Sequence, residues 1–370
     1  MKPRHLTNPR ILAICFAMLP LAAANAQTTG TWNNNTTTGL SWNTVGSWTG
    51  LTNGQVPNAI GATANFTMNI TAARTITMDG DKTVGTLAID DPTPTSTTYH
   101  GYTINAGTTF PTSRLIFDVA SGNAALNSPT AGNNVTNNIG VPITINDPLV
   151  ITSTKTNVNG TLNLNGSITD EAASLSITKE GNGIVQLAAA NTYDGGTFIN
   201  AGRLGAGNAT SYGTGSVTVA SGGQAWLSSG ATYGNDFTLA GQGYANTADA
   251  GALNGAMRYG GATTSGTIHI AADARIGGYG GANGTMAGPL TGSAALEINQ
   301  SGASHNGNIV LTGNAAGYTG TITVSQGTLR LGPASNLGGS LVVKDGANLY
   351  AEGVGGSGAA TIGTDSGSAR

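Results

Sequence analysis

The stretch of sequence that decides the fold reads Asn191-Thr192-Tyr193-Asp194-Gly195-Gly196-Thr197-Phe198-Ile199-Asn200-Ala201-Gly202-Arg203-Leu204. A related stretch follows 125 residues later and reads Ala316-Gly317-Tyr318-Thr319-Gly320-Thr321-Ile322-Thr323-Val324-Ser325-Gln326-Gly327-Thr328-Leu329. The two share a tyrosine, two glycines and two aliphatic positions at the same spacing: Tyr193 and Tyr318, Gly195 and Gly320, Ile199 and Val324, Gly202 and Gly327, and Leu204 and Leu329. Internal repetition of this kind predicts an array of similar units stacked in a row.

Short runs of alternating polar and apolar residues recur on both sides of these two blocks. Each run puts two or three apolar side chains on one face and Thr, Asn or Ser on the other, and turn-forming residues bound it. Examples are Thr75-Ile76-Thr77-Met78, Thr161-Leu162-Asn163-Leu164 and Ser216-Val217-Thr218-Val219. The pattern predicts short β-strands, and no stretch beyond the N-terminal leader has a convincing helical period.

The composition suits strands that stack in coils better than a wide globular core. Of the 370 residues, 58 are glycine, and only 8% are charged. Glycine and asparagine tolerate the left-handed backbone angles of tight turns, and threonine and valine pack well on a pleated surface. The sequence therefore predicts an all-β chain that folds as a right-handed parallel β-helix, a solenoid with roughly 20–25 residues in each coil.

The first 26 residues have the features of a secretory signal peptide. A basic start, an apolar run too short to span a bilayer and a small-residue cleavage site follow one another: Lys2, Arg4 and Arg10, then Ile11 to Leu19, then Ala24-Asn25-Ala26. Cleavage before Gln27 removes Cys15, the only cysteine. We expect a mature chain without thiols and without a transmembrane segment.

The charge of the chain excludes one class of partner. Without the leader, 11 Lys and Arg stand against 17 Asp and Glu, and no basic stripe remains. Nucleic-acid binding needs clustered Lys and Arg that neutralise phosphates. We therefore expect no nucleic-acid partner.

The string from Gly183 to Leu204 resembles the autotransporter-associated β-strand repeat of bacterial passenger proteins, and the copy that ends at Leu331 is a weaker match. Residues near the N-terminus are similar to the tryptophan-rich opening and the strand pattern that accompany such repeats: Trp32, Trp42, Trp48, Pro57 and Ala64-Asn65-Phe66, then Arg74 to Phe117. The resemblance implies a parallel β-helix, export to the cell surface and no catalytic residues. We expect the tryptophans to cap the N-terminal end of the rod.

The expected organisation has three parts. These are the signal peptide at 1–26, the N-terminal cap with the first coils at 27–170, and the autotransporter-associated repeats at 171–370. The expected location is extracellular or the outer-membrane surface of a Gram-negative-type bacterium. No pattern of a translocator barrel follows the repeats, and the chain ends Gly367-Ser368-Ala369-Arg370. The sequence thus predicts either a fragment of a longer autotransporter or a released protein.

Two groups of carboxylates deserve comparison with known site chemistry. Asp90-Asp91 is the best pair for glycosidase chemistry, which needs two carboxyl groups about 5–10 Å apart. Pro92-Thr93-Pro94 follows directly and favours an ordinary turn or loop. Asp79-Gly80-Asp81 has the carboxylate spacing of a calcium loop but lacks the remaining ligands, so a tight turn is the better interpretation.

The histidines are scattered, with His269 on the outward phase of a strand and His100 and His305 in polar loops. No two have the spacing of metal ligands, so we assign no catalytic, cofactor-binding or metal-binding residue. Exposed tyrosines beside polar loops could stack on sugars or bind protein partners. For the seven tyrosines that lie beside glycine or asparagine, the interpretation we favour is that they cover coil corners: Tyr193, Tyr212, Tyr233, Tyr244, Tyr259, Tyr279 and Tyr318.

Two functions remain. The first is a secreted or surface-displayed passenger that acts as a structural spacer, adhesin or matrix component without catalytic activity, with surface polysaccharide or a host or matrix protein as its partner. The second is a carbohydrate-active β-helix enzyme, a polysaccharide lyase or glycoside hydrolase, whose acidic residues converge from separate coils. Three or more charged residues in one groove favour the enzyme, and polar ladders of Thr, Asn and Ser without such a cluster favour the passenger.

Overall fold

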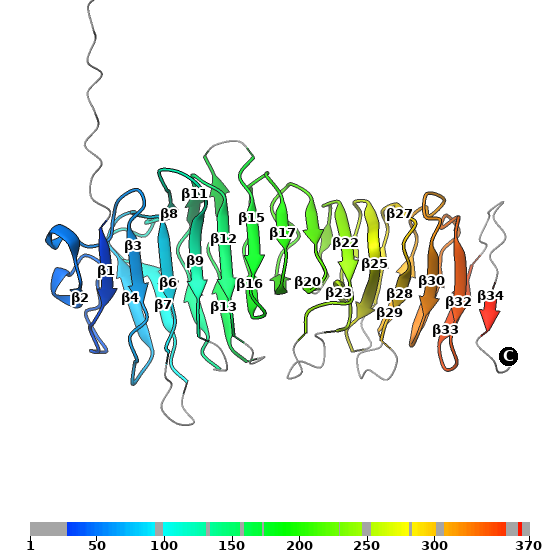
Figure 1. The fold of residues 1–370 in the computed structure, drawn as a ribbon, viewed down its shortest axis with the longest axis horizontal. Coiled ribbons are helices and arrows are strands. Elements are labelled where there is room, and N and C mark those ends of the chain that lie inside the picture. Colours follow the sequence, from blue (N-terminus) through cyan, green and yellow to red (C-terminus); the bar gives the residue numbers. More distant parts are fainter. Residues whose placement is uncertain are drawn as a thin grey trace, which may run out of the picture.

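The chain winds into a rod of short strands, with the coils in sequence order along the long axis (Figure 1). The computed structural model describes residues 28–92, 99–130, 134–155, 159–171, 174–228, 230–245, 253–280, 283–300, 307–352 and 362–364. The predicted signal peptide and His305 lie outside the described residues. Among those described, every strand pairing except one is parallel.

Two ladders of parallel strands form most of the largest sheet. The first contains β1 (Thr29–Trp32), β3 (Thr63–Phe66), β6 (Thr86–Ile89), β9 (Ala124–Ser128), β12 (Leu149–Ser153), β15 (Ile177–Glu180), β17 (Thr197–Ile199), β19 (Val217–Val219) and β22 (Phe237–Gly241). The second contains β4 (Arg74–Met78), β7 (Tyr102–Ala106), β10 (Asn137–Ile139), β13 (Thr161–Leu164), β16 (Ile184–Leu187), β18 (Gly202–Ala206), β20 (Gly223–Ser228) and β23 (Met257–Gly260).

The long strand β25 (Ile268–Gly278) joins these ladders, because its first residues pair with β22 and its last with β23. Beyond it, the ladders continue through β27 (Leu290–Gly292), and through β28 (Leu296–Ile298), β30 (Thr321–Val324), β32 (Ser340–Val343) and β34 (Ile362–Thr364). Two smaller sheets form a third face: β5 (Lys82–Val84), β8 (Leu115–Phe117), β11 (Ile143–Ile145) and β14 (Ile168–Asp170), then β21 (Thr232–Tyr233), β24 (Thr263–Thr264), β26 (Gly284–Met286), β29 (Asn308–Leu311), β31 (Thr328–Leu331) and β33 (Asn348–Ala351). The predicted parallel β-helix is confirmed.

The length of a coil follows from the register of the first ladder. Ile177 pairs with Thr197, Thr197 with Val217, and Val217 with Phe237, so that one coil takes twenty residues here. Thr86 pairs with Ala125, and that coil is longer because it contains an insertion. The predicted coil length therefore holds in the middle of the rod and is exceeded where loops are inserted.

Inward side chains of successive coils form columns along the rod. One buried column contains Leu149, Ile177, Thr197, Val217, Phe237, Ile268 and Leu290. Because successive residues of a strand point to opposite faces, the residues between these columns point outward, and His269 is exposed as predicted. Each coil buries only a few side chains, so the stability of the rod is a sum over neighbouring coils.

Aromatic residues close the N-terminal end of the rod. Trp32, Trp42, Trp48 and Phe66 are buried and pack with ring centroids 5.0–5.4 Å apart. Their strands and turns are β1, the antiparallel β2 (Trp48–Thr49), and the short 3-10 turns η1 (Val45–Ser47) and η2 (Thr52–Gly54). Each indole N–H donates to a backbone carbonyl, which meets the requirement of a buried polar group. The predicted tryptophan-rich cap is confirmed, and the boundary at residue 170 stays a prediction.

Candidate functional site

Each of the two sequence repeats makes one complete coil. In the first, the chain leaves β16, passes Tyr193 and β17, and returns in β18 directly beside β16, where Ile184 pairs with Arg203. In the second, it leaves β29, passes Tyr318 and β30, and returns in β31 beside β29. The repeat is therefore the unit that one turn of the solenoid requires.

The shared glycines fill two different requirements of this coil. Gly202 and Gly327 have φ angles of 69° and 70°, in the left-handed region that favours glycine. A Cβ atom at Gly195 would lie 2.3 Å from the carbonyl oxygen of Ser174, and one at Gly320 would lie 2.3 Å from that of Ala294. Gly202 and Gly327 are therefore needed because the backbone turns there, and Gly195 and Gly320 because neighbouring coils approach closely.

Replacing Gly202 by alanine is expected to lower the free energy of unfolding by at least about 1–3 kcal/mol, the cost of a strained backbone conformation. The new methyl would also lie 2.4 Å from the carbonyl oxygens of Gly181 and Gly183. The matched control is Gly46→Ala, where no atom lies within 4 Å and no positive φ occurs. Denaturant midpoints of both variants, measured by circular dichroism, test this, and equal midpoints would contradict it.

Most of the tyrosines considered for sugar stacking are instead part of the core. Tyr193, Tyr212, Tyr233, Tyr244, Tyr259 and Tyr318 have no exposed surface. Their hydroxyls are held at the corners of the coils: that of Tyr193 contacts the Thr197 hydroxyl at 2.7 Å, and that of Tyr318 donates to the Thr321 carbonyl at 3.0 Å. The corner interpretation is thus confirmed for these six, whereas Tyr279 is 44% exposed.

Lys179 interrupts an aliphatic column, because it lies between Ile151 and Ile199 in the first ladder. Its side chain is fully buried, and its Nζ donates to the backbone carbonyls of Glu180, Gly181 and Ala201 at 2.7, 2.5 and 3.0 Å. Burial lowers the pKa of Lys179 to about 7, against a smaller opposite effect of Glu180. The alternation that predicts the strand places this lysine inside, although the sequence interpretation assigned it no role.

The lowered pKa of Lys179 makes the stability of this coil depend on pH. Below pH 7 the lysine is charged in both states, and between pH 7 and 10.5 the unfolded chain binds more protons than the folded one. The free energy of unfolding therefore rises with pH in this window, by at most about 1.4 kcal/mol per pH unit. Lys179→Met is expected to remove this slope. The free energy of unfolding of the native chain and of Lys179→Met is measured by denaturant unfolding at pH 7, 8 and 9. An equal dependence on pH in the two proteins would contradict the lowered pKa of Lys179.

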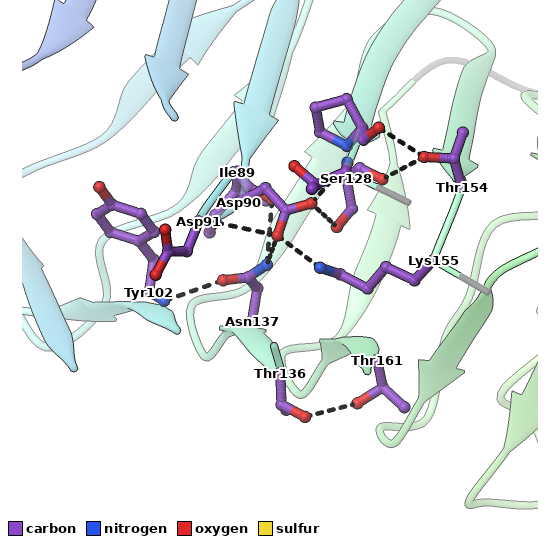
Figure 2. A network of polar contacts seen from close by, with 12 residues as sticks. Ile89, Asp90, Asp91, Tyr102, Ser128, Thr136, Asn137, Thr154, Lys155 and Thr161 are labelled. Carbon is purple, nitrogen blue, oxygen red and sulfur yellow. Dashed lines mark hydrogen bonds and ion pairs between the residues drawn. The ribbon is translucent and has the colours of Figure 1, made fainter. Parts of the chain in front are cut away.

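Asp90 lies at the centre of a buried polar network (Figure 2). Its Oδ1 contacts Lys155 Nζ at 2.5 Å and accepts a hydrogen bond from Asn137 Nδ2 at 3.2 Å, and its Oδ2 accepts from the Thr130 N–H at 2.9 Å. Asp91 is also fully buried. The pair follows β6 in an irregular segment, as the interpretation of a turn or loop predicts. Both side chains are nevertheless buried, and Asp90 contacts a lysine from a later coil.

A shallow groove of about 230 Å³ lies on the outside of the rod, lined by Gln242, Asp273, Glu297, Thr323 and Lys344 among others. It meets the condition of three charged residues in one groove that favours an enzyme. Both carboxylates, however, already have structural partners. Glu297 Oε2 accepts from Arg275 at 2.7 and 2.8 Å, and Asp273 accepts from the Ala295 N–H at 2.9 Å. The groove can therefore hold a polar ligand more readily than it can supply a general acid.

Aromatic rings stack with two buried arginines, Arg203 and Arg258, along the second ladder. The guanidinium groups of Arg203 and Arg258 lie 5.0 and 5.5 Å from the ring centroid of Trp226, and that of Arg258 lies 4.6 Å from the ring of Tyr279. Trp226 is half-buried, and Tyr279 is exposed. We call these four residues the aromatic–arginine cluster. Sequence reasoning missed it because it combines residues from four coils.

Other site classes find no support in the part of the chain that the structure describes. Within the described ranges, no group of three or more His, Cys, Asp or Glu side chains is placed to hold a metal ion. Over the same ranges, no helix has the length and apolar character that crossing a membrane requires. Asp79-Gly80-Asp81 forms the turn between β4 and β5, as predicted.

Comparison with known protein families finds a similarity at these two coils. The family model of the passenger-associated-transport-repeat matches residues 177–206 and 306–331. The first match begins with the first residue of β15 and ends with the last of β18, and the second ends with the last residue of β31. Searches of curated proteins and of solved structures gave no match. Over these two segments the chain is similar to the passenger-associated-transport-repeat, in agreement with its resemblance to the autotransporter-associated repeat.

Proposed function

We propose that this chain is an autotransporter-type passenger, exported to the surface of a Gram-negative-type bacterium, where the rod acts as a structural and adhesive element without catalytic activity. The observation that carries the proposal is that each match to the passenger repeat includes at least one whole coil of the solenoid. The signal-peptide pattern at residues 1–26 also supports export.

The coil-by-coil contacts and the absence of cysteine from the predicted mature chain both suit export across a membrane. Contacts in the rod join each coil to its neighbours, so that folding can propagate coil by coil as the chain emerges from a membrane. The single cysteine lies in the predicted leader. The mature chain therefore forms no disulfides, which would create closed loops before translocation.

Surface display is tested by protease treatment of intact cells that produce the chain with its native leader and its own downstream sequence. Digestion of the rod on intact cells, with a periplasmic marker protein left uncut, is the expected result. Digestion only after the outer membrane is permeabilised would contradict display. A rod found solely in the culture medium would support the released form over the displayed one.

For the adhesive role we propose that the aromatic–arginine cluster binds an acidic polysaccharide. Sugar rings stack on exposed aromatic faces, and the two neighbouring guanidinium groups, which are themselves buried, add positive charge next to this surface. Tyr279→Ala is expected to weaken retention on immobilised alginate at least tenfold. The matched control is Tyr350→Ala, an exposed tyrosine (57%) on β33. Equal retention of both variants would contradict this role.

The groove around Glu297 gives the alternative of a carbohydrate-active enzyme its one specific observation. The test is incubation of the purified chain with plant and bacterial polysaccharides, followed by assays for reducing ends and unsaturated products. We expect neither product. The control is Glu352→Gln, which alters an exposed ion pair with Arg330. Product formation that is lost in Glu297→Gln but kept in Glu352→Gln would establish the enzyme instead.

A further inference from the structure

Asp90 and Lys155 meet inside the rod although 65 residues separate them in the sequence. Their side chains have no exposed surface, and the distance of 2.5 Å between Nζ and Oδ1 is shorter than the usual ~2.7–2.9 Å of a charge-assisted hydrogen bond. Taking two full charges out of water is costly. Burial lowers the pKa of Lys155. Transfer of its proton across the short contact to Asp90 gives the free amine and the carboxylic acid, which are the forms that can react with each other.

We propose that Lys155 and Asp90 become joined by an intramolecular amide bond. The unprotonated Nζ attacks Cγ of the Asp90 carboxylic acid, and a C–N bond forms. The C–Oδ1 bond then breaks, and Oδ1 leaves as water with one proton from the acid and one from the amine. The reaction converts one amine and one carboxylic acid into one amide and one water, so that it needs no oxidant, reductant or other co-reactant.

The surroundings of Asp90 supply what such a reaction requires (Figure 2). The Thr130 N–H and the Ser128 hydroxyl donate to Oδ2 at 2.9 and 3.3 Å, and they would stabilise the negative charge that develops on this oxygen during attack. Oδ2 then remains as the amide oxygen on the same donors. Oδ1, which lies against Lys155, also accepts from the Asp91 N–H at 3.0 Å and is the oxygen that leaves.

Asp91 supplies a second carboxyl group near this step, with its side chain on the side of Asp90 that faces Tyr102 (Figure 2). Its carboxyl is fully buried beside Asp90, and its charge acts on the pKa of Lys155, which desolvation lowers and the two carboxylates raise. A carboxylate here can take the proton from the attacking amine and give it to the leaving oxygen. Asp91 is thus assigned a role in moving a proton, while Asp90 and Lys155 form the bond.

The amide would tie three successive coils together. Asp90 follows β6, Ser128 is the last residue of β9, and Lys155 follows β12, and these strands are neighbours in the first ladder. The lysine therefore reaches past the middle coil to the first. Such a covalent tie would give a chain without disulfides the cross-link that other exported proteins obtain from cysteine.

Mass spectrometry of the purified full chain tests the bond directly. The expected intact mass is about 18 Da, one water, below the mass of the sequence, and a protease digest is expected to contain the peptide of Asp90 joined to that of Lys155. Lys155→Met and Asp90→Ala abolish both signals. The matched control is Lys82→Met, which removes another buried lysine whose Nζ contacts backbone carbonyls.

The digest decides the outcome even where a variant fails to fold, because it is read on the native sequence. A native protein whose two peptides separate after digestion, both unmodified, would overturn the proposal. Asp91→Asn is expected to leave a larger share of the chain unjoined than the native protein. A fully joined Asp91→Asn protein would remove the role of Asp91 and leave that of Lys155 and Asp90 intact.

Discussion

Trp42→Ala is expected to lower the free energy of unfolding by about 3–5 kcal/mol, the usual cost of truncating a large buried aromatic side chain. Trp42 has no exposed surface, and its ring lies 5.0 Å from Phe66 and 5.4 Å from Trp48. Its Nε1 also donates to the Pro57 carbonyl at 2.9 Å, and truncation leaves that buried acceptor without its donor. Denaturant unfolding followed by tryptophan fluorescence and circular dichroism measures the loss.

The same change is expected to expose the end of the rod. An uncovered strand edge offers unpaired backbone groups to other chains, so Trp42→Ala should also form soluble oligomers, which light scattering detects. Phe110→Ala is the matched control, because Phe110 is 49% exposed and its loss should change stability by less than about 0.5 kcal/mol. Similar unfolding curves for the two variants would show that the tryptophans do not form the cap.

Lys155→Met is the second change with a large expected effect, a loss of about 3–5 kcal/mol in the free energy of unfolding. It leaves the fully buried Asp90 carboxylate without its cation, while Asn137 and Thr130 remain as neutral donors. The amide proposed above would add to this loss, because a cross-link also restricts the unfolded chain. Arg114→Met is the control, since it removes the exposed ion pairs with Asp81 and Glu171, which contribute at most about 1 kcal/mol.

The double variant Asp90→Asn/Lys155→Met separates the two contributions. Replacing both members of a buried ion pair by neutral groups is often nearly neutral. If only an ion pair is present, the double variant should recover much of the stability that Lys155→Met loses. If the amide is present, the double variant should stay well below the native protein. A single variant Lys155→Met as stable as the native chain would contradict the importance of this contact altogether.

The fold could be predicted from the sequence because two local signals agree with each other. Alternation in stretches such as Thr321-Ile322-Thr323-Val324 specifies which side chains point inward, and the structure buries Ile322 and Val324 as expected. Tyr193 and Gly202 mark where the coil turns in the first repeat, and Tyr318 and Gly327 have the same burial and backbone angle in the second. Local pattern suffices here because each coil contacts chiefly the coil before and after it.

The buried polar groups could not be predicted in the same way. The inward phase of Leu149, Ile151 and Ser153 continues to Lys155, and that of Ile177 continues to Lys179, so the sequence did hold a signal that these lysines are buried. Their partners, however, depend on register. Asp90 meets Lys155 only because the coils between them stack in one particular alignment, and the lengths of the intervening loops that set this alignment have no local pattern.

The exposed sites depend on register for the same reason. The groove combines Asp273, Glu297 and Lys344 from three coils, and the aromatic–arginine cluster combines Trp226 and Tyr279 with arginines from two others. None of these residues has a neighbour in the sequence that marks it as part of a site. In a solenoid, a surface site is a property of several rungs, and it becomes visible only when the pairing is known.

The stacking of coils in register is tested most directly by distances between spin labels on one outward column. Nine parallel pairings lead from Thr63 to Thr291 through Thr178, and five of them lie between Thr178 and Thr291. At about 4.8 Å per rung, labels on introduced cysteines in a Cys15→Ala chain should lie about 43 Å apart for Thr63 and Thr291 and about 24 Å apart for Thr178 and Thr291. Pulsed electron–electron double resonance is expected to give two narrow distance distributions, whose mean distances have this ratio. Broad distance distributions, or a distance below about 30 Å between the labels at Thr63 and Thr291, would contradict the stacked rod.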